Sequence, residues 1–397
     1  MASFGDALTR LMTAQGVGVH ELARESNYTA GHISNLRTGS KRASPQCAAE
    51  LDEILGAGGE LIAAAGLGAR DADPGLMAGP HRQTVPLLMV SADDVRPVEH
   101  LRRFRDLISD HDSLFGPHAL MPVVREQLAL IQQLRQGRTG ADSRDLLVVQ
   151  AQYAETLAWQ HQDCAEFRSA QYWLDRALEW AHMAGDMQWA AFVLARKSQL
   201  AGDMHDPAAS VDLAEAAARL ASGGGTRLRA ASAAYEAHGH ALAGNAEACE
   251  QALDEAAEIA ERPDDDPSAP WTAWLTPAYV EVARARCLGV LGEHETAAGL
   301  FGQAIDGIPA SLRRERGVHL ARQAVARACA GDVRGAAGAG VRAARIADLT
   351  GSGRIVTELR RLDRTLRRRW PSDAATDEVH HAIASLVVPR QSRAQRR

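Results

Sequence analysis

The side chains with the clearest chemical potential stand close together near the N-terminus, between residues 29 and 42. Asn35 carries an amide that can form two hydrogen bonds with an adenine edge, which discriminates against a wrong base by ~1–3 kcal/mol. Arg37, Lys41 and Arg42 are cations of the kind that hold phosphate groups and set the register of a bound nucleic acid. This combination of side chains predicts nucleic-acid binding and not covalent chemistry.

Patterns that would support catalysis or a cofactor are weak. His294 and Glu295 begin a zinc-binding pattern, but Ala298 stands where that pattern needs a second histidine. The closely spaced glycines of residues 335–340 follow no strand, so a dinucleotide-binding loop is not expected. The five cysteines are scattered without a CxxC pair and are expected to be buried thiols in a reducing compartment. We therefore predict no catalytic residue, no metal site and no cofactor.

The polar residues near the N-terminus are positioned by a pattern of two short helices within residues 19–39. Leu22 and Ile33 belong to apolar positions that recur at helical spacing on either side of a polar turn. Thr29 suits the N-cap of the second helix, because its hydroxyl can accept a free backbone amide. Gly39 suits the end of that helix. The pattern is typical of a helix-turn-helix, whose second helix enters the DNA major groove.

Residues 4–65 resemble the Cro/C1-repressor (XRE) type of helix-turn-helix domain. The resemblance rests on Glu21–Ala23, Ile33–Ser34, Leu36 and the turn at Gly39. It implies a DNA-contacting set made of Thr29, Ala30, Gly31, His32, Ser34, Asn35, Arg37, Lys41 and Arg42. Within this set the family pattern places Ala30, Gly31, His32 and Asn35 toward the bases. Ala30 and Gly31 are smaller than the polar pair usual at these positions, so the expected base readout is thin.

Composition divides the chain into four parts. Residues 1–66 form the predicted five-helix DNA-binding domain. Residues 67–97 contain several glycines and four prolines and are predicted to be a linker. Residues 98–388 carry helical periodicity throughout, and residues 389–397 are predicted to be a disordered basic tail. The expected fold class is all-α.

The long helical part contains a loose repeat. Turn-like segments recur about every 40 residues, longer than a regular tetratricopeptide unit. They are marked by Asp163, Gly202, Gly244, Gly292 and Gly331. Helices of small residues follow these turns, and stacked pairs of such helices bury a continuous core. This part resembles the tetratricopeptide-like sensor region of large regulators from high-GC Gram-positive bacteria, which implies a right-handed superhelix of antiparallel helix pairs that senses a ligand and mediates dimerisation.

Four tryptophans lie in one stretch of this part: Trp159, Trp173, Trp180 and Trp189. Such residues more often pack in the core of the repeats, and the alternative is an aromatic-lined pocket for an effector. Tetratricopeptide regulators that hold extended peptides do so with a ladder of asparagines. This chain has only Asn27, Asn35 and Asn245. A small molecule or a folded partner protein is therefore the expected effector.

The net charge of -6 at pH 7 confines any DNA contact to a local basic surface. Together these features predict a bacterial, cytoplasmic transcription regulator that binds a palindromic operator in double-stranded DNA as a homodimer. No membrane partner is expected, since no apolar run is long enough to span a bilayer. The alternative is a protein–protein adaptor whose repeat domain binds a partner while the helix-turn-helix only docks. The arginines of residues 360–369 suit the end of a helix or a second phosphate-binding surface.

Overall fold

The structure is a computed structural model that describes residues 4–15, 17–26, 28–41, 43, 45–55, 57, 60–65, 97–221, 226–262, 276–308 and 312–386. All regular structure within these residues is helical, which confirms the predicted all-α class for them. The chain divides into two compact units, Met1–Val95 and Arg96–Arg397, and each is described by itself. The predicted tail and all but Pro97 of the predicted linker lie outside the described residues. No helix in the described ranges is long and apolar enough to cross a membrane.

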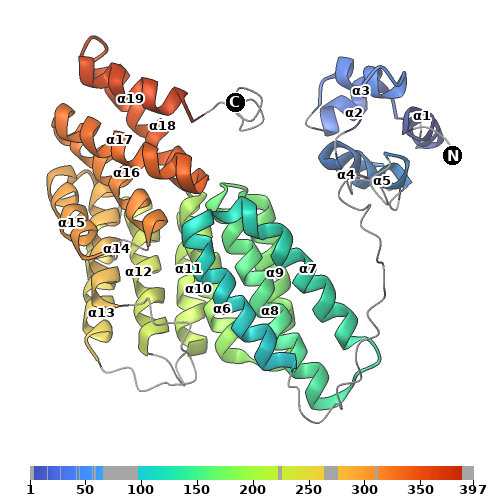
Figure 1. The fold of residues 1–397 in the computed structure, drawn as a ribbon, viewed down its shortest axis with the longest axis horizontal. Coiled ribbons are helices and arrows are strands. Elements are labelled where there is room, and N and C mark those ends of the chain that lie inside the picture. Colours follow the sequence, from blue (N-terminus) through green and yellow to red (C-terminus); the bar gives the residue numbers. More distant parts are fainter. Residues whose placement is uncertain are drawn as a thin grey trace, which may run out of the picture. The chain divides into compact units, whose positions relative to one another are not determined.

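The first unit is a cluster of short helices around one apolar core. The helices are α1 (Phe4–Gln15), α2 (Val19–Glu25), α3 (Ala30–Arg37), α4 (Pro45–Ile54) and α5 (Glu60–Ala64) (Figure 1). Leu8, Leu22, Ile33 and Leu51 come from four of these helices and are all fully buried in one cluster. Burial of each such side chain contributes roughly 1.5–3 kcal/mol, so this core holds α3 against its neighbours.

Both ends of α3 form as its sequence predicts. The Thr29 hydroxyl accepts a hydrogen bond of 3.3 Å from the backbone N–H of His32. Gly39, just beyond the helix, has a φ of 71°, which glycine adopts without steric cost. A Cβ at Gly5 of α1 would lie 2.5 Å from the carbonyl oxygen of Arg37, so α1 approaches α3 more closely than any larger residue would allow.

The second unit is a succession of helices, each of which packs on the next. Its first half contains α6 (Pro97–Phe115), α7 (Pro117–Arg135), α8 (Gly140–Asp163), α9 (Phe167–Ala184), α10 (Met187–Asp203), α11 (Pro207–Leu220) and α12 (Thr226–Leu242). Its second half contains α13 (Ala246–Ala260), α14 (Pro277–Leu291), α15 (His294–Gly307), α16 (Arg313–Ala330), α17 (Val333–Thr350), α18 (Gly353–Arg369) and α19 (Ala374–Ala384) (Figure 1). These sequential helix pairs match an α-helical repeat array.

The turns between paired helices share one backbone design, in which a left-handed residue is followed at once by the N-cap of the next helix. Gly244, Gly292 and Gly331 hold the left-handed position with φ of 76°, 97° and 95°. Ala165 and His205 hold it in the two earlier turns, with φ of 61° and 60°. Asp163 and Gly202, taken as markers from the sequence, instead end a helix or lie within one.

Alternate helices, α10, α12, α14, α16 and α18, form the inner layer of the second unit. α10 contacts α12, α12 contacts α14, and α16 contacts α18. The core clusters between layers consist largely of alanine, as in α10 and α17, which lets helix axes approach closely. The inner side of α8 is polar, with buried Gln150, Glu155, Gln160 and Asp163.

The last helices of the second unit return to its first ones. α16 contacts α6, and α18 contacts α8. Arg314 of α16 forms an ion pair with Asp112 of α6. Ser352, next to α18, donates a hydrogen bond of 2.8 Å to Asp163 at the end of α8. Buried polar groups therefore close the repeat array on itself.

Candidate functional site

The outward face of α3 carries most of the residues predicted to contact DNA. Ile33 and Leu36 are buried and fix the orientation of the helix. The residues left exposed on and beside the helix are Thr29, Gly31, Ser34, Asn35, Arg37 and Lys41, and Ala30 and His32 are half-buried. Arg42 lies outside the described residues. The described members of the predicted set thus lie on α3 or just beyond its two ends, and none of them is fully buried.

Asn35 and Arg37 are available for a ligand in different degrees. The side-chain amide of Asn35 has no hydrogen bond to any described residue, while its backbone carbonyl accepts one from Lys41 at 3.1 Å. The Nε of Arg37 lies 3.5 Å from the hydroxyl of Thr9 on α1, which orients its guanidinium along the surface. No atom lies within 4 Å of a Cβ built on Gly31, so the surface there is open.

His32 is held by the protein itself. Its ring stacks on Tyr28, with centroids 4.9 Å apart, and its Nδ1 lies 3.4 Å from the ammonium of Lys41. Because an ammonium only donates, Nδ1 is the acceptor, and the ring proton belongs on Nε2, 4.0 Å from the sulfur of Cys47. Burial, with Cys47 and Glu50 nearby, raises the pKa of Tyr28 to about 12. This geometry makes His32 a support for Lys41 more than a free reader of bases.

The four tryptophans proposed for an effector pocket lie in different surroundings. Trp189 is 2 % exposed and packs against Phe192 in the core. Trp173 and Trp180 are half-buried against two core clusters. Trp159 is surrounded by guanidinium groups, with Arg196, Arg314 and Arg354 at 4.7, 5.3 and 4.8 Å from its ring centroid. An effector site formed by these four rings stays a prediction.

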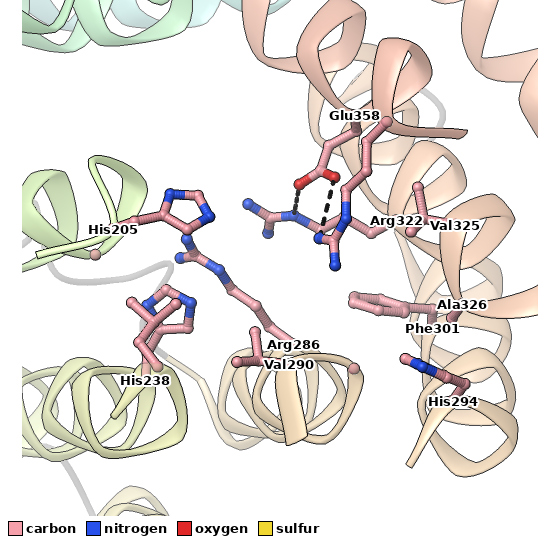
Figure 2. Close-up of a pocket in the computed structure, with 14 residues that line it drawn as sticks. His205, His238, Arg286, Val290, His294, Phe301, Arg322, Val325, Ala326 and Glu358 are labelled. Carbon is pink, nitrogen blue, oxygen red and sulfur yellow. Dashed lines mark hydrogen bonds and ion pairs between the residues drawn. The ribbon is translucent and has the colours of Figure 1, made fainter. Parts of the chain in front are cut away.

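A cavity of about 70 Å³ opens on the inner helices, away from all four tryptophans. Its lining residues come from the inner helices α10, α12, α14, α16 and α18 and from α15, and His205 of the α10–α11 turn joins them. Figure 2 shows the guanidinium ends of Arg286 and Arg322 directed toward the middle of this cavity. The charged and titratable lining residues are His205, His238, Arg286, His294, Arg322, Glu358 and Arg361.

Two carboxylates neutralise the arginines of this cavity in part. Arg286 donates from Nη2 to Asp203 at 2.6 Å. Glu358 is shared, with one oxygen 3.3 Å from Nε of Arg322 and the other 3.9 Å from Nη1 of Arg361. Among the described residues, the terminal nitrogens of Arg322 have no hydrogen-bond partner. The cavity therefore contains unused guanidinium donors.

The positive potential at the cavity shifts the neighbouring titrations. Although burial raises it, the guanidiniums of Arg286, Arg354 and Arg322 hold the pKa of Asp203 well below its ordinary value. Burial, with Arg286 and Arg322 nearby, lowers the pKa of His238 well below its usual range. Burial and the charge of Arg286 lower the pKa of Arg322 to about 10. The positive charge of the arginines at the cavity is thus only partly balanced by carboxylates.

Sequence reasoning missed this cavity, because its members stand far apart in the chain. One local signal did exist: His205 occupies a turn position where the later turns have glycine. Arg286 and Arg322 do not stand out in the sequence, because α14 and α16 contain further arginines. Within the described ranges no group of three or more histidine, cysteine or acidic side chains could hold a metal ion.

No protein-family model matches the chain, and no curated protein matches it.

Proposed function

We propose that this protein is a sequence-specific DNA-binding transcription regulator with an N-terminal domain of the Cro/C1 type. The observation that carries the proposal is the two-sided character of α3. Ile33 and Leu36 lock one side into the core, Asn35 and Arg37 stand exposed on the helix, and Lys41 stands exposed beyond its C-terminal end. A rigidly held helix with an amide and a cation outward and a second cation beyond its end has the chemistry that reads a major groove.

The second unit is the proposed sensor and dimerisation domain, of tetratricopeptide-like type. Its inner layer contains a small cavity lined by several repeats, and a domain that places a ligand group among helices of several repeats can couple binding to its shape. In a homodimer, two copies of α3 would meet half-sites about one helical turn apart. Operation in the bacterial cytoplasm follows from this role. Sedimentation of the full chain should give twice the mass of one chain.

Selection of bound sequences from a random pool of DNA duplexes by the full-length protein tests the proposal. The selected sites should share a palindromic motif. Asn35→Ala should weaken binding to that motif by roughly 1–3 kcal/mol and relax specificity at one base position. Lys41→Ala should weaken binding to all sequences and flatten the salt dependence by about one unit of slope.

The control variant is Gln251→Ala, which removes an exposed amide on α13 of the second unit. It should leave DNA affinity unchanged. Recovery of no common motif, or equal loss with all three variants, would favour an adaptor whose N-terminal domain only docks on protein.

A further inference from the structure

We propose that the cavity lined by His205, Arg286 and Arg322 binds a tetrahedral oxyanion, either free phosphate or the phosphate group of a small molecule. The binding itself does not depend on the proposed function, whereas the idea that this anion is the effector of a regulator does rest on it.

The size of the cavity suits one such group. A cavity needs about 10–15 Å³ to hold one water, and a water occupies about 30 Å³ of the liquid, so a cavity of 70 Å³ has room for a group of a few heavy atoms. A phosphate group contains five heavy atoms. Arginine guanidiniums match its oxygens because their N–H groups form a planar fork that donates two parallel hydrogen bonds.

The arginines at the cavity outnumber the protein carboxylates that could compete with an oxyanion for them. Arg286, Arg322 and Arg361 stand against two carboxylates, Asp203 and Glu358. Glu358 reaches Arg322 only at Nε, and both terminal nitrogens of that guanidinium are left without a hydrogen bond among the described residues. An oxyanion in the cavity would satisfy these donors and balance the third cation.

The lowered pKa values of His238, His294 and Arg322 also support an anion site. In each case a nearby arginine acts with burial against the charged form of the group, so its pKa falls. Burial is the larger cause of each shift, and the further lowering by the arginine charges indicates a positive potential, which favours an anion.

His205 supplies an independent argument from the backbone. The equivalent turn position is glycine in three other turns, because its φ is left-handed. A histidine there is harder to accommodate, and backbone strain of this kind clusters at functional sites. The His205 ring lines the cavity (Figure 2), and its Nδ1 donates to the backbone carbonyl of Asp203 at 3.3 Å, so the ring donates to an oxyanion through Nε2 when it is protonated.

Isothermal titration calorimetry of the full chain without DNA tests the proposal, with sulfate, inorganic phosphate and glycerol 3-phosphate as probes. Chloride at matched ionic strength is the reference. We expect binding of all three oxyanions in the millimolar range or tighter. Tighter binding of inorganic phosphate would identify the free ion as the ligand class, and tighter binding of glycerol 3-phosphate would identify a phosphorylated small molecule. Because no DNA is present, this outcome is separate from the DNA-binding result.

Three variants locate the binding. Arg322→Met should weaken it by about tenfold or more, since a hydrogen bond to a charged group is lost. His205→Gly should weaken it by about threefold. The side chain of Arg361 is 49 % exposed, so Arg361→Met changes the rim of the cavity without disturbing the buried layer. It should also weaken binding, and it tests the site even if Arg322→Met fails to fold.

Two control variants sit outside the cavity. Ala165→Gly repeats the turn change in a different repeat, and Arg219→Met removes an exposed arginine of α11. Both should bind the oxyanions as the parent does. The proposal is overturned if no oxyanion binds better than chloride, or if the cavity variants bind as tightly as these controls.

Discussion

The hydroxyl of Ser352 donates a hydrogen bond of 2.8 Å to the carboxylate of Asp163, across 189 positions of sequence. Both groups are fully buried. Asp163 also faces the guanidiniums of Arg314 and Arg354, at 3.8 and 4.0 Å. Burial, only partly opposed by these cations, raises the pKa of Asp163 above its usual value. The junction between the first and last repeats of the second unit is thus polar, and the bond from Ser352 is the one hydrogen bond that the Asp163 carboxylate accepts among the described residues.

Ser352→Ala is expected to destabilise the second unit. It removes the hydroxyl donor from a buried carboxylate, and a buried acceptor left short of a partner costs about 1–3 kcal/mol. Urea unfolding followed by circular dichroism measures the loss. The matched control is Ser109→Ala, since Ser109 is exposed and bonds only within its own helix. An equal effect of both substitutions would contradict a structural role for the junction.

Gly31→Ala is expected to stabilise the first unit. A Cβ there meets no atom, and alanine is favoured over glycine within helices by up to ~1 kcal/mol. If Gly31 faces DNA, Gly31→Leu should abolish operator binding although the free protein tolerates it. Thermal unfolding and gel-shift assays measure the two effects. Gly299→Ala and Gly299→Leu are the controls, because Gly299 on α15 is also exposed with open space around it. Unchanged operator binding by Gly31→Leu would remove Gly31 from the DNA-contacting set.

Local sequence signals anticipated local structure. The Thr29 cap, the Gly39 turn and the buried Ile33 of α3 each depend on a few neighbouring residues, and each was predictable from spacing and residue type. The internal partners of His32 were not predictable, since Lys41 and Cys47 reach it through the packing of separate elements.

The cavity of the second unit could not be predicted, because it is formed by residues that lie far apart in the sequence. Arg286 meets Asp203 across 83 positions, and the turn at His205 is left-handed despite having no glycine. Spacing along one helix carries no information on which inner helices become neighbours. The sequence markers Asp163 and Gly202 lie a few residues before the left-handed positions of their turns, because Ala165 and His205 adopt that conformation without being glycine.

His319 is expected to make stability depend on pH. Burial, with the charges of Arg322, Arg354 and Arg286 and despite the opposing Glu315, lowers the pKa of His319 to about 4. Its folded pKa lies below the value near 6.5 of an unfolded histidine, so the unfolded chain binds more protons between these pH values. The stabilisation is complete above pH ~6.5 and is lost as pH falls toward ~4, by roughly 3 kcal/mol in all.

Urea unfolding at a series of pH values measures this dependence. His319→Gln should flatten the fall in free energy of unfolding between pH ~6.5 and ~4, because glutamine does not titrate. His182→Gln replaces an exposed histidine of α9 and should keep the slope of the parent. If His319→Gln and the parent show the same slope, the titration of His319 does not control acid stability.

His205→Gly is expected to stabilise the folded chain although it weakens anion binding. The left-handed φ of 60° costs a non-glycine residue about 1–2 kcal/mol, and glycine avoids this cost. Glycine also loses more conformational entropy on folding, so the net gain should be about 1 kcal/mol or less. Ala165→Gly, with a φ of 61°, should gain a similar amount. Gly292→Ala makes the reverse change at a φ of 97° and should destabilise. Free energies of unfolding for the three variants test this prediction. A loss of stability in His205→Gly, beside a gain in Ala165→Gly, would contradict it. That outcome would mean that the histidine ring itself stabilises the fold and that its left-handed backbone is not a strain kept for ligand binding.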